Sequence, residues 1–161
     1  MSITAQQQLV IEQQQRYYDA VDRTGEHLDG KAAALLQVGS LVITIAGLAT
    51  LLGPQPALSP WALGALAAVA LLFRGMIACI VMAWRPADHK LPGSTDWDTM
   101  FDRYISCPVD DAYNLALANL LDATAYNLAR NRQKAELVTL AGWLLVAQVG
   151  AILLAGLMMA L

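Results

Sequence analysis

Three long apolar segments restrict what this chain can fold into more than any other feature. They cover residues 32–52, 61–84 and 137–161, which gives lengths of 21, 24 and 25 residues. A helix needs roughly 20 residues to cross the hydrocarbon core of a bilayer. Only 14% of the 161 residues are charged, whereas an average soluble domain carries about 25%. We therefore predict an all-α integral membrane protein with three transmembrane helices and a helical cytoplasmic part.

The first two apolar segments are predicted to form a hairpin, residues 32–84. Only the eight residues GPQPALSP, at 53–60, join them. This connection is too short for an outer domain, so the two spans must be antiparallel neighbours. Trp61 and Trp84 bound the second span, and indole rings favour the two membrane interfaces.

The basic residues predict the orientation of the chain. Nine of the ten Lys and Arg residues lie in residues 1–31 and 85–136, and the tenth, Arg74, lies inside the second span. Segments rich in Lys and Arg stay on the cytoplasmic side of a membrane. We expect a multi-pass protein of the bacterial inner (plasma) membrane, with the N-terminus in the cytoplasm and the C-terminus outside.

The cytoplasmic part is predicted to be helical. A first helix over about residues 2–24 carries an apolar stripe, and Gly25 and Gly30 create a weak point before the first span. A short helix is expected over about 96–105 with Thr95 as a candidate cap. A long helix begins at Val109 and, without proline or glycine up to residue 140, is expected to continue into the third span. The apolar stripe of the first helix consists of Val10, Tyr17, Val21 and Leu28.

One charge inside a predicted span makes Arg74 the leading functional candidate. It lies ten residues from Trp84, about 15 Å along a helix, and therefore near the bilayer centre. Three interpretations stay open: arginines from several copies line an anion-favouring pore, Arg74 holds a closed bundle through Gln148 and backbone carbonyls, or it snorkels toward the headgroups. The candidates for a pore or gate are Arg74, Gln148, Thr44, Ser40 and Gln37.

A second group of basic residues lies close to the predicted inner headgroups. These residues set the orientation of the spans, or they capture an anionic ligand. The candidates are Arg130, Arg132, Lys134 and Arg85.

The sequence contains no motif typical of an enzyme. We find no phosphate-binding loop, no nucleophile with a plausible base and no dinucleotide fingerprint. His27 and His89 have no partner at metal-ligand spacing, and Cys79 and Cys107 are expected to be free thiols. We expect no catalytic residues, no metal, no cofactor and no nucleic-acid partner.

Two short stretches resemble a known group of proteins. They are LDGKAAALL at residues 28–36 and YNLARNRQKAELVTLAGWLL at residues 126–145. Together with the layout of the spans, they resemble small bacterial membrane effectors of nucleotide-signalled antiphage systems, which include the Pycsar transmembrane effectors and SLATT-type proteins. The resemblance implies a protein that is held inactive at the inner membrane and impairs that membrane on infection.

Two function hypotheses follow. In the first, the protein is a defence effector that forms homo-oligomers in the lipid bilayer and permeabilises or depolarises it when triggered, with a cyclic nucleotide or a soluble regulatory partner as the trigger. In the alternative, it is a non-conducting membrane adaptor or scaffold that presents its cytoplasmic helices to a soluble partner.

Overall fold

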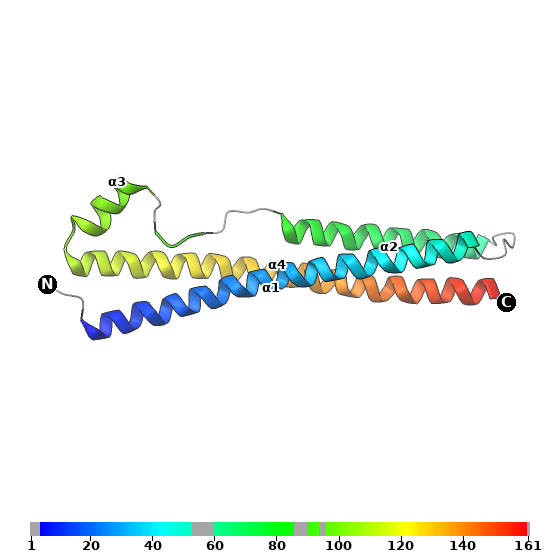
Figure 1. Cartoon of the computed structure of the whole chain (residues 1–161), viewed down its shortest axis with the longest axis horizontal. Helices are drawn as coiled ribbons and strands as arrows, with labels where there is room; N and C mark the ends of the chain where they lie inside the picture. The colour runs from blue at the N-terminus through cyan, green and yellow to red at the C-terminus, as the bar shows by residue number, and fades with distance from the viewer. Residues whose placement is uncertain (1–3, 53–59, 86–89, 94–95, 161) are drawn as a thin grey trace. The chain divides into compact units, whose positions relative to one another are not determined.

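The computed structural model describes residues 4–52, 60–85, 90–93 and 96–160 (Figure 1). The helices in chain order are α1 (Ala5–Leu52), α2 (Pro60–Trp84), α3 (Trp97–Met100), the π-helix η1 (Phe101–Ile105) and α4 (Val109–Ala160). No strand occurs in this described part of the chain, and three of its helices are long and apolar enough to cross a membrane. The predicted all-α membrane fold is confirmed.

The helix α1 joins the predicted N-terminal helix and the first span into one element of 48 residues. It passes Gly25 and Gly30 without a break, so the predicted helix end near Thr24 is wrong. A glycine weakens a helix by only about 1 kcal/mol relative to alanine. Contacts with α4 at Val21, which precedes Gly25, and at Asp29, which lies between Gly25 and Gly30, hold this part of α1 in place.

The helix α4 begins at Val109 and runs for 52 residues, which confirms the prediction of an unbroken helix into the third apolar segment. Asp110 and Asp111 in its first turn favour the positive end of the helix dipole. The predicted short helix over 96–105 is divided into α3 and η1, where the Ser106 amide donates to the Phe101 carbonyl at 2.9 Å. Residues 53–59 of the predicted turn and the proposed cap Thr95 lie outside the described residues.

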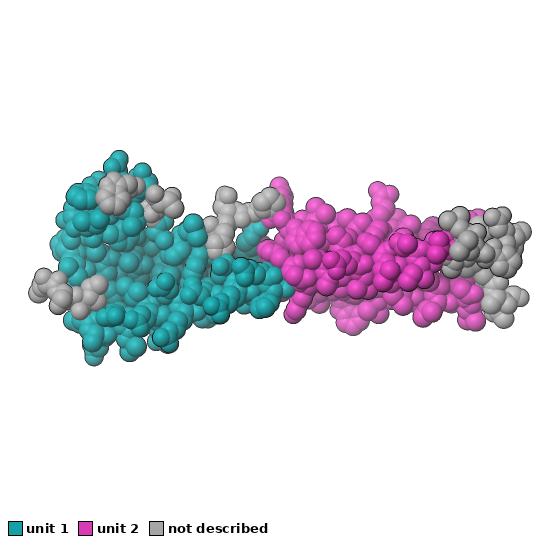
Figure 2. All heavy atoms as spheres, viewed as in Figure 1, with its two compact units in different colours: residues 1–27, 86–132 teal, residues 28–85, 133–161 magenta. Residues whose placement is uncertain are grey.

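The chain divides into two compact units, which Figure 2 colours separately. Unit 1 comprises residues 1–27 and 86–132, and unit 2 comprises residues 28–85 and 133–161. The helices α1 and α4 contribute to both units, α2 belongs to unit 2, and α3 and η1 belong to unit 1. The assignment of residues 1–31 and 85–136 to the cytoplasm stays a prediction.

Unit 2 is mostly apolar, both in its core and on its surface. Met76 and Ile80 of α2 are 0% and 1% exposed, whereas Leu71 on the same helix is 68% exposed. Such a surface suits lipid, because apolar side chains need not be hidden from a bilayer. The core of unit 2 consists of Ala32, Met76, Cys79, Ile80, Ala83, Val138 and Ala141.

A close approach of α1 and α2 depends on Gly39. The Met76 thioether lies over this glycine, with its sulfur 3.0 Å from the position that a Cβ atom would take, and the Phe73 ring lies 3.6 Å from it. Small residues let helices in a membrane approach closely. The contact also shows that Gly39 and Met76 lie at the same level of the bundle.

Unit 1 buries only part of the apolar stripe that we predicted on α1. Val10 and Tyr17 are 44% and 50% exposed, whereas Tyr18 and Val21 are 9% and 5% exposed. Tyr18 packs with Leu120 and Ala123 of α4. Val21 of the predicted stripe is buried as expected, whereas Tyr18 takes the buried position in place of Tyr17, because its hydroxyl finds a hydrogen-bond partner there.

We predict that Gly39→Leu destabilises unit 2, because the new side chain must displace Met76 and push α1 away from α2. Overpacking of this kind costs about 1–3 kcal/mol, measurable as an earlier unfolding midpoint in lipid nanodiscs. The control is Gly150→Leu on α4, where nothing lies within 4 Å of the added Cβ. Equal midpoints for the two variants would contradict the proposed close approach.

Candidate functional site

The polar residues predicted within the spans do not share one environment. Gln148 is 0% exposed, and neither its side-chain nitrogen nor its oxygen has a hydrogen-bond partner. Arg74, Thr44, Ser40 and Gln37 are all exposed. The lock between Arg74 and Gln148 that we considered from the sequence is therefore not formed within one copy.

Arg74 lies on the outer face of α2. It is two residues from the buried Met76, which is about 200° around a helix, so it points away from the core of unit 2. No hydrogen bond or ion pair joins it to another described residue. A charged side chain at the bilayer centre costs at least about 2.5–3.5 kcal/mol on insertion scales. Arg74 therefore requires water, headgroups or a second molecule.

The outward face of α1 carries what we call the hydroxyl stripe, Gln37, Ser40 and Thr44. Spacings of three and four residues place the three side chains on one face of the helix. The Ser40 hydroxyl donates to the Leu36 carbonyl at 2.8 Å, and the Thr44 hydroxyl donates to the Ser40 carbonyl at 2.8 Å. Each hydroxyl proton is used within the helix, so the oxygens present only their acceptor lone pairs outward.

Gln148 lies nearer than Arg74 to the end of unit 2 that holds the C-terminus of α1. A methyl group of Leu144 is 3.5 Å from the Cβ position of Gly75, so these two residues mark one level. Gln148 follows Leu144 by four residues, so it lies about 6 Å nearer to the end of unit 2 that holds the C-terminus of α1. Arg74 is one residue from Gly75 and lies only about 1.5 Å nearer to that end. The interpretation in which Arg74 binds Gln148 would therefore require a contact across almost one helical turn.

Of the basic residues proposed to capture an anion, Lys134 already has a carboxylate partner. Its ammonium group lies 2.9 and 2.8 Å from the two carboxylate oxygens of Asp29. The Lys134 side chain is 17% exposed and that of Asp29 is 44% exposed, so an anionic ligand would have to compete with Asp29. Arg130 is half-buried, and Arg85 and Arg132 are exposed.

Unit 1 contains a polar contact that the sequence analysis missed. We call it the Lys90 clasp, formed by Tyr18, Lys90, Asp122 and Asn127. The Asn127 side chain accepts from the Lys90 amide at 3.2 Å and donates to the Lys90 carbonyl at 3.1 Å. Tyr18 donates to the same carbonyl at 3.3 Å, and the Lys90 ammonium group pairs with Asp122. The segment at Lys90 is thereby tied to both α1 and α4.

The environment of Tyr18 favours the protonated hydroxyl, which is the form that donates in the clasp. Burial, followed by the nearby Asp22 carboxylate, raises the pKa of Tyr18 above its ordinary value, while the hydrogen bond with Asn127 lowers it. A tyrosine hydroxyl is protonated at neutral pH in any case, and a raised pKa extends the pH range over which it can donate to Lys90.

Asn131 forms a second contact between α1 and α4 in unit 1. Its amide nitrogen donates to the Val21 carbonyl at 2.6 Å, and its amide oxygen lies 3.0 Å from the Cβ position of Gly25. Asn127 and Asn131 are four residues apart on the buried face of α4, one turn from each other. That spacing in the stretch YNLARN is the signal that could have identified them.

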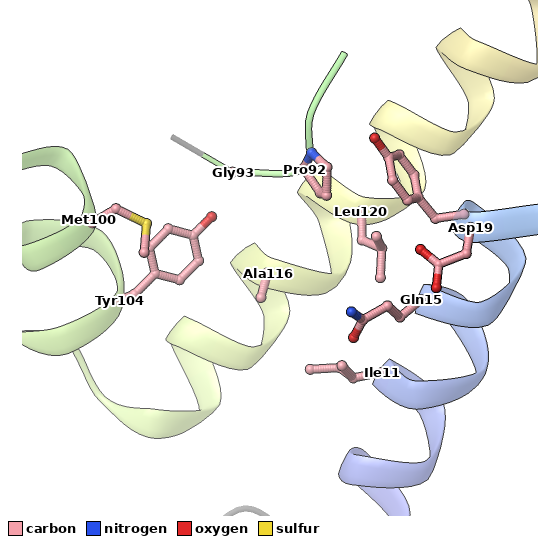
Figure 3. A pocket seen from close by; sticks show the side chains of 10 residues that line it. Ile11, Gln15, Asp19, Pro92, Gly93, Met100, Tyr104, Ala116 and Leu120 are labelled. Atoms are coloured by element: carbon pink, nitrogen blue, oxygen red, sulfur yellow. The ribbon is translucent and has the colours of Figure 1, made fainter. Parts of the chain in front are cut away.

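A cavity of about 330 Å³ lies in unit 1 beside the clasp (Figure 3). Its size falls at the lower end of the range for small-molecule sites. The rings of Tyr18 and Tyr104 line it, together with the polar ends of Gln15 and Asp19. The Tyr104 hydroxyl accepts from Asn119 at 2.5 Å. The remaining described residues of the lining are Ile11, Pro92, Gly93, Met100, Ala116 and Leu120.

The charge of the cavity limits what it can bind. Its described lining has one carboxylate, Asp19, and no Lys or Arg. None of the four basic candidates Arg85, Arg130, Arg132 and Lys134 belongs to that lining. A phosphate inside would be repelled by Asp19, whereas an uncharged aromatic ring with hydrogen-bond donors would find suitable partners there.

We predict that Gln148→Leu stabilises unit 2 in lipid nanodiscs. An unpaired buried amide carries a desolvation penalty of about 1–3 kcal/mol, which an apolar side chain of similar shape removes. The matched control is Gln37→Leu, which replaces an exposed glutamine. A loss of stability in Gln148→Leu would show that the amide has a partner, and would contradict its role as an unsatisfied group.

We predict that Asn127→Ala releases the segment at Lys90 without unfolding the helices. The variant removes the two hydrogen bonds that pair Asn127 with the Lys90 backbone, so hydrogen exchange at the Lys90 amide should become at least about tenfold faster. Asn114→Ala, at an exposed position of the same helix, should leave it unchanged. Equal exchange rates in wild type and Asn127→Ala would refute the clasp.

Comparison with known proteins supports the antiphage resemblance. The family model for the Pycsar effector protein domain, PycTM, matches residues 14–161, all but the first thirteen residues of the chain. No curated protein and no solved structure matches the chain. The match includes the residues of both units, among them Arg74, Asn127 and Gln148. The chain belongs to the Pycsar effector protein domain family and is a membrane-embedded effector of antiphage defence.

Proposed function

We propose that this effector assembles from several copies in the inner membrane and permeabilises or depolarises it when triggered. The observation that carries the proposal is the placement of Arg74, a charge on the outer face of an apolar helix with no partner among the described residues of its own chain. Within one copy the core of unit 2 is filled, with Met76 and Ile80 almost completely buried. A path for water or ions must therefore form between copies.

The positive charge of Arg74 would favour the passage of anions through such a path. Several copies would place several Arg74 side chains around it, and rings of basic residues favour anion passage. The spans offer no carboxylate to neutralise them, because no Asp or Glu occurs in residues 32–52, 61–84 or 137–161. Ser40, Thr44 and Gln37 supply further polar surface, and Gln148 would gain hydrogen bonds if opening brought water to it.

The proposal includes the orientation of the chain. Unit 1 lies in the cytoplasm and the C-terminus lies outside, as the distribution of Lys and Arg favours. This orientation exposes the cavity of unit 1 to cytoplasmic signals.

A cyclic nucleotide is the trigger that we propose. Its base would occupy the cavity, where Gln15 and Asp19 can meet amino or imino groups and the tyrosine rings offer apolar walls. Its phosphate would remain at the mouth, because Asp19 disfavours an anion inside. The cavity is lined by residues of both α1 and α4, so the ligand would act directly on the two helices that continue into unit 2.

We predict that phage challenge depolarises cells expressing the wild type and admits a membrane-impermeant dye, whereas Arg74→Leu at equal abundance reduces both signals at least about tenfold. The substitution removes the charge that makes the spans favourable for water and anions. Arg74→Lys should retain part of the effect. Arg103→Leu, which removes an exposed arginine from η1 of unit 1, should behave as the wild type.

The proposal is wrong if neither the wild type nor any variant depolarises cells with or without phage. That outcome would favour a non-conducting adaptor, for which unit 1 has one supporting feature. It exposes large apolar side chains on both long helices, a surface of the kind that binds partner proteins. They include Leu9, Val10, Leu121, Tyr126 and Leu128. An adaptor would retain a stoichiometric soluble partner in Arg74→Leu.

A further inference from the structure

Two features on the outer surface of unit 2 are chemically complementary. Arg74 on α2 carries five N–H donors and no acceptor, and it has no partner among the described residues of its own chain. The hydroxyl stripe on α1 presents oxygen acceptors, because the Ser40 and Thr44 protons are already donated to backbone carbonyls at 2.8 Å. One surface has unused donors and the other has unused acceptors.

The two features lie at the same depth. Gly39 and Met76 are in contact and mark one level of the bundle. Arg74 is two residues from Met76 along α2, which places it about 3 Å nearer to the end of unit 2 that holds the C-terminus of α1. Ser40 and Thr44 lie about 1.5 and 7.5 Å in the same direction. Arg74 of a second copy at the same depth in the bilayer would therefore meet the stripe between Ser40 and Thr44.

We propose that Arg74 of one copy binds the hydroxyl stripe of the next copy within the bilayer. The contact joins two different surfaces of the same chain, so it is head to tail and closes into a ring when the rotation between copies permits it. A symmetric contact of two Arg74 residues would instead place like charges together in a medium of low dielectric constant. This inference rests on the proposed assembly of copies and specifies the surface that joins them.

The test is cross-linking between two differently tagged copies in native membranes. Both copies carry Cys79→Ala and Cys107→Ser, one also carries Leu71→Cys beside Arg74, and the other carries Leu41→Cys beside the stripe. Leu71 and Leu41 are 68% and 59% exposed, so neither substitution opens the core. A membrane-permeable thiol cross-linker is applied before and after phage challenge. The number of copies per assembly is counted separately by stepwise bleaching of a fluorescent tag.

The depth-matched control replaces Leu41→Cys by Val146→Cys on α4. Val146 is 61% exposed and lies two residues from Leu144, which is level with Gly75. We expect the Leu71–Leu41 pair to cross-link at least about tenfold more than the Leu71–Val146 pair. Arg74→Leu should reduce the Leu71–Leu41 product about tenfold, in line with the strength of hydrogen bonds between helices in membranes.

A second variant, with two substitutions, tests the same contact in case Arg74→Leu inserts poorly into the membrane. Ser40→Ala with Thr44→Val removes the acceptors and leaves the arginine in place, and it should lower the same product to a similar extent. If bleaching counts several copies and cells depolarise, but the Leu71–Leu41 product does not exceed the control, the interface is wrong and the proposed function stands. If bleaching counts single copies after phage challenge, both are wrong.

Discussion

Hydrocarbon offers no hydrogen bonds, and this constraint governs the half of the molecule that holds the three apolar segments. A polar group within these segments must find a partner in the protein or remain unsatisfied. Most of the unit avoids the problem by being apolar inside and outside. Within the apolar segments the exceptions include a buried amide at Gln148, an outward charge at Arg74 and hydroxyls on α1 that are already bonded to their own backbone. An isolated copy therefore leaves Gln148 and Arg74 without a partner among the described residues, and the proposed assembly between copies would supply one for Arg74.

Unit 1 contains, in contrast, polar contacts that join α1 and α4 to each other and to the segment at Lys90. Asn127 and Tyr18 hold the backbone of Lys90, and Asn131 reaches a carbonyl of α1 where Gly25 leaves room. The cavity shares Tyr18 with this network. Because α1 and α4 belong to both units without a break, a ligand that alters their contact in unit 1 acts on the same two helices that pack in unit 2. Continuous helices with two arrangements are a physical means of coupling distant sites.

The sequence predicted the features that depend on local composition. The spans follow from the length of the apolar segments, and the continuity of α4 follows from the absence of proline and glycine between Val109 and residue 140. The sequence did not predict the continuity of α1, because contacts made by Asn131 and Lys134 more than 100 residues away offset the weakness at Gly25 and Gly30. Nor did it predict which polar residues are buried. One of the three interpretations joined Arg74 to Gln148, but Arg74 is exposed on α2 whereas Gln148 is buried. The Lys90 clasp depends on pairing between residues 37 positions apart, which no local pattern reveals.

The most direct test of the account is the current through a planar lipid bilayer that contains the purified protein. The current is recorded before and after addition of each 3′,5′-cyclic mononucleotide, and then of a small-molecule extract from phage-challenged cells. The account predicts discrete steps of current only after a trigger is added, with a reversal potential in a salt gradient that shows preference for anions. A bilayer that stays silent under every one of these conditions, with the protein shown to be inserted, would contradict it.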